Sequence, residues 1–303
     1  MVLDVVKSLH HLYSSGLYSN VLEFCNLTNC TKDVFVESLG LTQGCQVLMY
    51  LADSLMELRE WRRAEPVYRQ ILHAKKQARN NPIPKIAINS NNINDNCNEV
   101  EIKYKLHQCY LNMGQSNNQA INILQSIVAK SRTPKVNMAL AKLYHANNME
   151  RPAMAAYREV VRECPLAAEA IRGLLQLGVK PREIQEMTAE SDVDNNNSEW
   201  MNDWLAGQYK LYSKDYDGAV RDLVAVEANV LQGSPSCTVD IGVAHHWAGH
   251  QDQAMLCLAR AATLTPLTLR GMDSLAALYA DAGRDDKWIM NKSDMSIQYK
   301  LKV

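Results

Sequence analysis

The clearest hydrophobic pattern in the chain lies between Pro134 and Pro165, where large, small and aromatic residues recur three and four positions apart. This spacing predicts two amphipathic helices, because residues at such intervals share one face of an α-helix. Ala141 and Ala153 fall where the two helices should approach most closely, so a larger side chain would separate the axes. Pro165 lacks an amide hydrogen and therefore ends the second helix. The stretch predicts an antiparallel helix pair that leaves one apolar face uncovered.

The offsets match those of the tetratricopeptide repeat (TPR), which is about 34 residues long, and they recur along the chain. Pro266, for example, follows Ala254 at the interval that separates Pro165 from the corresponding alanine of the first stretch. A single repeat cannot cover its own apolar face, so such repeats must stack. We therefore predict an all-α fold, a right-handed superhelical TPR solenoid. The predicted framework residues are Leu51, Ala52, Ala64, Tyr68, Tyr110, Ala120, Leu140, Ala141, Tyr144, Ala153, Tyr157, Pro165, Gly207, Ala219, Gly242, Ala254, Ala261 and Pro266.

Two polar stretches interrupt this pattern. The first is dense in asparagine, contains two prolines and has no helical period, so it predicts a flexible surface insertion. After Trp288 the pattern fades, and the array is expected to be truncated. The predicted organisation is N-terminal TPR units that dimerise (1–78), an Asn-rich insertion (79–99), central TPR units (100–188), a polar loop (189–199) and C-terminal TPR units (200–303).

Composition and charge agree with a stack of thin helical layers, since 47% of the residues are hydrophobic but only 7% are aromatic. The formal net charge is -1 with both signs interspersed, which predicts protein partners rather than nucleic acid or a membrane. The eight cysteines form no C-x-x-C pair, which favours a reduced compartment. The chain begins without a secretory signal pattern, so a cytosolic or nuclear location is expected.

Two groups of residues resemble metal ligands but do not predict a metal. His245, His246, His250, Cys237 and Cys257 are close in sequence, yet His250 follows a glycine turn, so the histidines do not share one continuous helix.

A second group, Asp192, Asp194 and Asn196, imitates the start of a calcium loop. Asn197 occupies the place of the required glycine, and no glutamate closes the loop. There is also no nucleophile elbow and no Gly-rich phosphate loop. We predict no enzyme, no cofactor and no metal.

Several runs that extend into the positions between framework residues resemble subunit seven of the anaphase-promoting complex. The generic repeat leaves some of these positions free, such as Arg132, Thr133, Glu150 and Arg151. The runs are SGLYSNV (15–21), YLADSL (50–55), EIKYK (101–105) with Cys109 and Tyr110, RTPKVNMALAKLY (132–144), ERP (150–152), RECPLAAEAIRGLL (162–175) and RGMD (270–273).

This resemblance implies a non-catalytic scaffold in a large ubiquitin ligase that drives cell-cycle progression. It also implies homodimers formed through N-terminal repeats, a place among related TPR subunits, and coactivator tails as a further candidate ligand class. Residence in the nucleus and cytoplasm, with spindle association, would follow. Known members are longer, so the chain is expected to be a fragment or a short form.

The dimer hypothesis also has a physical motive in the first unit. A terminal repeat recovers its ordering cost from one neighbour only, yet this unit places more apolar surface along its helices than a capping unit should leave in water. The predicted interface residues are Leu9, Leu12, Tyr13, Leu17 and Tyr18. Some of them are also expected to pack on the unit that begins at Cys45.

A different binding function stays open, namely a TPR co-chaperone or another peptide-binding adaptor. Co-chaperones clamp a C-terminal carboxylate with Lys or Arg and Asn at the fifth and ninth positions of first helices. Of the pairs at these positions only Lys142 fits, so the groove better suits an apolar or aromatic helix. The pairs are Met49 and Asp53, Tyr104 and Gln108, Met138 and Lys142, Trp204 and Gln208, and Val239 and Val243.

Overall fold

A computed structural model describes residues 2–31, 39–80, 98–114, 117–189, 198–266 and 269–282. Within these ranges every regular element is a helix, which confirms the predicted all-α TPR class. The chain divides into two compact units, Met1–Ala156 and Tyr157–Val303, and we describe each by itself. The predicted polar stretches fall largely at residues 81–97 and 190–197, which lie outside the described residues, as does the expected truncation after Trp288.

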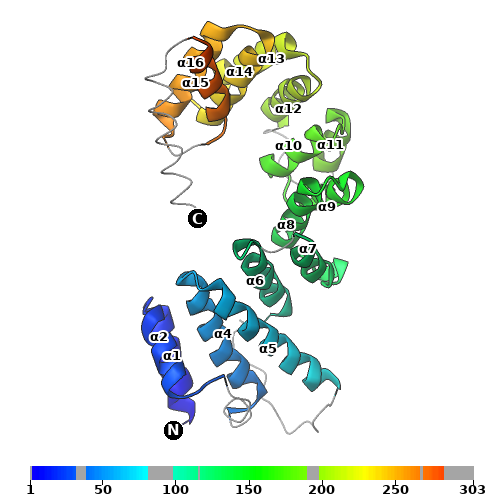
Figure 1. Cartoon of the computed structure of the whole chain (residues 1–303). Helices are drawn as coiled ribbons and strands as arrows, with labels where there is room; N and C mark the ends of the chain where they lie inside the picture. Colours follow the sequence, from blue (N-terminus) through cyan, green and yellow to red (C-terminus); the bar gives the residue numbers. More distant parts are fainter. Residues whose placement is uncertain are drawn as a thin grey trace. The chain divides into compact units, whose positions relative to one another are not determined.

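The first unit consists of helices that follow one another as antiparallel pairs (Figure 1). Each second helix packs against the first helix of the next pair, as α2 does on α4, α5 on α6 and α7 on α8. The helices are α1 (Val2–Ser14), α2 (Tyr18–Leu27), α4 (Leu41–Glu57), α5 (Trp61–Asn80), α6 (Glu99–Asn112), α7 (Asn117–Gln125), the short 3-10 helix η1 (Ala129–Ser131), α8 (Pro134–Ala146) and the start of α9 (Glu150–Glu163).

The second unit repeats this arrangement (Figure 1). Here α12 pairs with α13 and α14 with α15, while α11 packs on α12, α13 on α14 and α15 on α16. The helices are the end of α9, α10 (Ala168–Gln176), α11 (Pro181–Ala189), α12 (Ser198–Tyr212), α13 (Tyr216–Asn229), α14 (Pro235–Ala248), α15 (Gln251–Leu264) and α16 (Met272–Asp281).

The framework residues occupy the cores of these pairs. Every framework residue except Pro165 and Pro266 is buried. The two prolines follow the last residues of α9 and α15, where they cannot continue a helix.

Glycine allows a close approach of paired helices at two positions, Gly207 of α12 and Gly242 of α14. A Cβ on Gly207 would lie 2.8 Å from Leu223 Cδ2, and a Cβ on Gly242 would lie 2.7 Å from Leu258 Cγ. First and second helices therefore approach closely at both positions.

The structure corrects both boundaries of the predicted insertion at 79–99. Helix α5 continues through Asn80, and α6 already begins at Glu99. The reason at the second boundary is Asn98, whose side chain accepts a hydrogen bond from the backbone N–H of Val100 and so caps the start of α6. The predicted polar loop at 189–199 is likewise too wide, because α11 includes Ala189 and α12 begins at Ser198.

Candidate binding site

The histidine and cysteine residues singled out in the sequence do not assemble into a metal site. The Nδ1 atoms of His245 and His250 lie 3.4 Å apart. Across the described ranges, no group of three or more His, Cys, Asp and Glu side chains could hold a metal ion. The calcium-like residues Asp192, Asp194 and Asn196 lie outside those ranges. A separate finding concerns membranes: none of the described helices combines the length and hydrophobicity that a membrane span requires.

The predicted dimer surface is only partly available to a partner. Leu9 is fully buried within the first unit, which corrects its assignment, since a residue with no exposed surface cannot contact a second copy. Leu12 and Tyr18 are half-buried. Tyr13 packs its ring against those of Tyr18 and Tyr50.

Leu17, at the turn between α1 and α2, keeps 46% of its surface exposed. It is the member of the predicted set that offers most apolar surface to a partner.

Asp53 of α4 gathers polar groups from three other helices of the first unit. It accepts hydrogen bonds from the hydroxyl of Tyr68 at 2.6 Å and from that of Tyr13 at 3.4 Å. The ammonium of Lys105 contacts both of its oxygens, at 2.9 and 2.8 Å. Burial and the nearby Asp53 carboxylate raise the pKa of both tyrosines. Asp53, the ninth position of the unit that begins at Cys45, is therefore engaged by side chains of the same chain.

Asp240 of α14 is the corresponding centre in the second unit, and its side chain is fully buried. Gln208 Nε2 donates to its Oδ2 at 2.6 Å. Arg172 Nη2 contacts the same oxygen at 3.0 Å, and Arg270 forms an ion pair with Oδ1. Both guanidinium groups also donate to the hydroxyl of Ser236, at 3.1 and 3.2 Å.

Burial lowers the pKa of Arg172, and burial together with the neighbouring Arg172 charge lowers that of Arg270. This is the pattern expected when two partly buried cations share one carboxylate.

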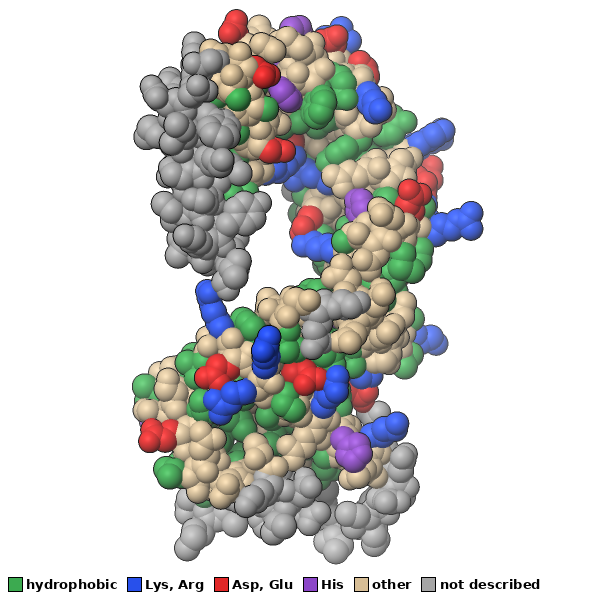
Figure 2. Space-filling model, viewed as in Figure 1, with side chains coloured by type: hydrophobic (Ala, Val, Ile, Leu, Met, Phe, Trp, Pro, Cys, Tyr) green, Lys and Arg blue, Asp and Glu red, His purple; other side chains and the backbone are tan. Residues whose placement is uncertain are grey.

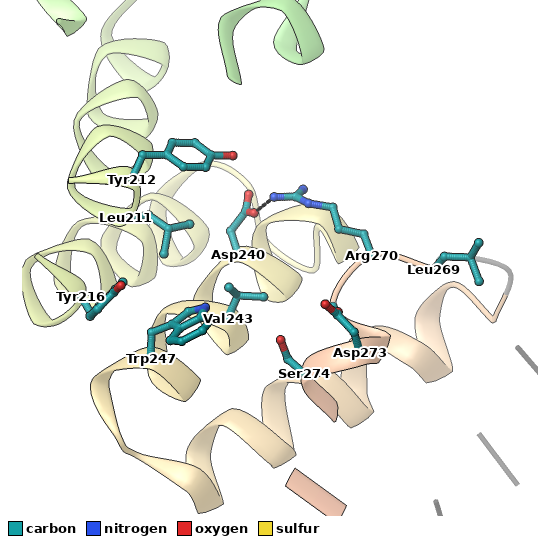
Figure 3. Close-up of a pocket in the computed structure, with 11 residues that line it drawn as sticks. Leu211, Tyr212, Tyr216, Asp240, Val243, Trp247, Leu269, Arg270, Asp273 and Ser274 are labelled. Atoms are coloured by element: carbon teal, nitrogen blue, oxygen red, sulfur yellow. Dashed lines mark hydrogen bonds and ion pairs between the residues drawn. The ribbon is translucent and has the colours of Figure 1, made fainter. Parts of the chain in front are cut away.

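A cavity of about 620 Å³ opens beside this cluster, between α12, α14 and the start of α16. Figure 3 shows Arg270 pointing toward Asp240, with Trp247 and Tyr216 at another side of the same pocket. These two rings are stacked at a centroid distance of 6.3 Å, and 60% of the Trp247 surface is exposed. An aromatic pair of this kind, with Trp247 exposed and Tyr216 half-buried, offers a wall for an apolar or aromatic side chain.

A smaller cavity of about 280 Å³ lies between α10, α12 and the start of α14. Its walls include Trp200, Met201 and Trp204, and the guanidinium of Arg172 lies 5.2 Å from the centre of the Trp204 ring. Both cavities therefore contain a member of the Asp240 cluster.

The site residues predicted from the sequence do not include Arg172, Asp240 or Arg270. Arg172 is the fifth residue of α10, so the clamp positions contained a signal for it. Asp240 gave no signal, because nothing in its sequence context identifies its two arginine partners.

The charged side chains on one face of the molecule are mixed in sign. On the face shown in Figure 2, basic and acidic side chains alternate within each unit, without an extended field of one sign.

Comparisons with known proteins identify relatives that share one name. No family model matches the chain. It is 31% identical over 287 residues to proteins named anaphase-promoting complex subunit 7 from Mus musculus and Homo sapiens, covering 93% of this chain and 51% of each relative. An Arabidopsis thaliana protein of the same name is 27% identical over 257 residues, covering 76% of this chain and 44% of that relative. The chain thus spans about half the length of the curated relatives it matches.

Among solved structures, a TPR protein from Parabacteroides merdae aligns with a TM-score of 0.55 at 13% identity, covering 83% of this chain and 92% of that one. This similarity supports the fold alone. The sequence similarity confirms the resemblance to anaphase-promoting complex subunit 7.

Proposed function

We propose that this relative of anaphase-promoting complex subunit 7 is a non-catalytic TPR scaffold subunit of that ubiquitin ligase. It would help to assemble the lobe of TPR subunits that supports coactivator and substrate recruitment. The observation that carries the proposal is sequence similarity to subunit 7 along 93% of the chain. Solenoids suit this task, because stacked repeats expose long surfaces to several partners at once.

The 620 Å³ cavity supports contact with an apolar or aromatic segment of another subunit. Trp247 is the natural anchor of such a contact, since aromatic side chains in pockets contribute much of the energy of protein interfaces. A coactivator tail is a further candidate for the same surface. The co-chaperone alternative has less support, because the clamp positions Asp53 and Gln208 are engaged with residues of this chain.

We also propose that the chain forms a homodimer through its first unit. Leu17 contributes exposed apolar surface there, and two-fold dimers are the commonest symmetric assembly. Residence in the nucleus and cytoplasm, with spindle association, is part of the same proposal.

Co-expression with the other TPR subunits of the complex, followed by affinity purification and size-exclusion chromatography, tests the assembly role. We expect the chain to co-elute with them, and Trp247→Ala to reduce the co-eluting fraction without changing the helical circular dichroism. The Parabacteroides merdae protein is a matched control, because it shares the fold but not the sequence similarity. Equal recovery of this control, or no co-elution of the chain, would contradict the proposal.

A further inference from the structure

The 280 Å³ cavity combines an apolar interior with one cation. Trp200, Met201 and Trp204 come from α12, and Leu166 and Leu231 come from the segments that precede α10 and α14. The Arg172 guanidinium also lines this cavity. No carboxylate is among its described lining residues. It is large enough for one or two side chains rather than for a drug-sized ligand, whose pockets start at about 300 Å³.

Arg172 keeps hydrogen-bonding capacity for a ligand. A guanidinium has five N–H donors, and the contacts to Asp240 and Ser236 both come from Nη2. Its Nε is buried and has no partner among the described residues. The Trp204 ring beneath the guanidinium holds the group in place by a cation–π contact.

Within the Asp240 cluster the charges favour an anion, although the Glu169 carboxylate also acts on Arg172. Arg172 and Arg270 share the single carboxylate of Asp240, so the three side chains together carry an excess positive charge. The excess is one positive charge, because two guanidinium groups share one carboxylate in this cluster. One further carboxylate would neutralise it. In a partly buried site such a charge attracts an anion more strongly than it would in water.

We propose that this cavity binds an extended peptide of a protein partner, taking an internal Asp or Glu carboxylate onto Arg172 and the neighbouring large apolar side chain between the two tryptophans. This ligand recognition goes beyond the scaffold role, and the isolated chain should show it.

Two observations favour a side-chain carboxylate over other anions. A clamp for a free C-terminus also needs a donor at the ninth position of the helix, and that residue, Gln176, already donates to the hydroxyl of Tyr212 at 3.3 Å. A phosphate dianion would exceed the positive charge that Arg172, Arg270 and Asp240 leave uncompensated. A carboxylate matches that charge and can accept a two-pronged contact from a guanidinium.

The test uses the purified full chain and a phage library of random peptides of about 12 residues, an ample length for an extended segment. We expect enriched sequences to carry Asp or Glu next to Phe, Leu, Met or Trp. One enriched sequence is then made as an acetylated, amidated peptide, together with versions carrying Asn or Gln, or phosphoserine, at the acidic position. Fluorescence polarisation measures their affinities.

We expect the amidated acidic peptide to bind and its Asn or Gln version to bind roughly tenfold more weakly, as for loss of a charged partner. Binding only to peptides with a free C-terminus, tighter binding of the phosphoserine version, or no acidic residue in the enriched set would each overturn the proposal.

Variants of the chain locate the site. Arg172→Gln should weaken binding by roughly tenfold, whereas Arg182→Gln should not, because Arg182 is an exposed arginine of α11 outside the cavity.

If Arg172→Gln perturbs the fold, substitutions of Leu166 test the site instead. Leu166 lines the cavity while 65% of its surface is exposed, so a change there should leave the fold intact. Leu166→Lys should strengthen binding of the acidic peptide several-fold and Leu166→Glu should weaken it, with circular dichroism unchanged in both. Equal affinities for these two variants would overturn the proposal.

Discussion

Gly242 of α14 lies so close to Leu258 of α15 that a Cβ at residue 242 would be 2.7 Å from Leu258 Cγ and 2.8 Å from Cδ2. In an open helix, replacing glycine by alanine stabilises by about 1 kcal/mol. Here Leu258 is fully buried and cannot move aside. We expect the clash, at about 1–3 kcal/mol, to outweigh the helix propensity.

The prediction is therefore that Gly242→Ala lowers the free energy of unfolding in urea denaturation. The matched control removes the Leu258 side chain, with which the new Cβ would clash. In a Leu258→Ala background the space is free, so the same glycine substitution should become neutral or stabilising. An unchanged destabilisation in that background would show that the contact with Leu258 is not the cause.

The second prediction concerns Asp240, whose buried carboxylate lies between two guanidinium groups. Asp240→Asn keeps the size of the side chain but leaves both cations without a counter-charge. Removing one partner of a buried ion pair costs about 3–5 kcal/mol, and we expect a loss of this order in the free energy of unfolding.

Chemical denaturation followed by circular dichroism measures it. Asp203→Asn is the control, because Asp203 is exposed on α12, and surface changes of this kind stay within about 0.5 kcal/mol. Equal effects of the two substitutions would contradict the role assigned to Asp240.

The third prediction concerns pH. Burial lowers the pKa of His107 from 6.5 to about 4, so its imidazole stays neutral in the folded chain while the unfolded chain takes up a proton. Between pH 6.5 and 4 the unfolded state therefore binds more protons than the folded state. The free energy of unfolding is unaffected by protonation of His107 above pH 6.5 and falls as the pH is lowered toward 4. The expected loss is about 3 kcal/mol, because each pKa unit corresponds to about 1.4 kcal/mol.

Urea denaturation of wild type and His107→Gln at several pH values between 6.5 and 4 tests this. Other groups also titrate in this range, so the relevant quantity is the difference between the two proteins. That difference should narrow or reverse as the pH falls. Parallel curves would show that His107 does not control the pH dependence.

The fourth prediction revises the proposed dimer surface. Tyr13 contacts Asp53, so a glutamate at Tyr13 would place two carboxylates together and disturb the fold. Leu17 is the cleaner target because it is exposed. Leu17→Glu should convert the dimer into a folded monomer in light scattering, since a two-fold interface repeats each substitution.

Leu256→Glu is the matched control, because Leu256 is exposed on α15 in the other unit. It should leave the dimer intact. Wild type that is already monomeric at tens of micromolar, where an obligate interface would be saturated, would contradict the dimer.

The hydrophobic pattern alone predicts the helices and the packing between neighbours in the stack. The small residues at Ala141 and Gly242 and the proline at Pro165 act over short intervals, because helix pairing in a repeat depends on residues within one or two units. The period of the apolar positions therefore sufficed to place the core.

Which polar groups meet depends on how the helices stack. Arg172 and Asp240 lie far apart in sequence, on helices α10 and α14, and come together only when α10, α12 and α14 stack. Polar residues on a solenoid face have no period that identifies their partners, because contact depends on the lateral offset between helices. The same holds for Leu9, whose burial depended on how α1 lies against α4 and not on its own hydrophobic pattern.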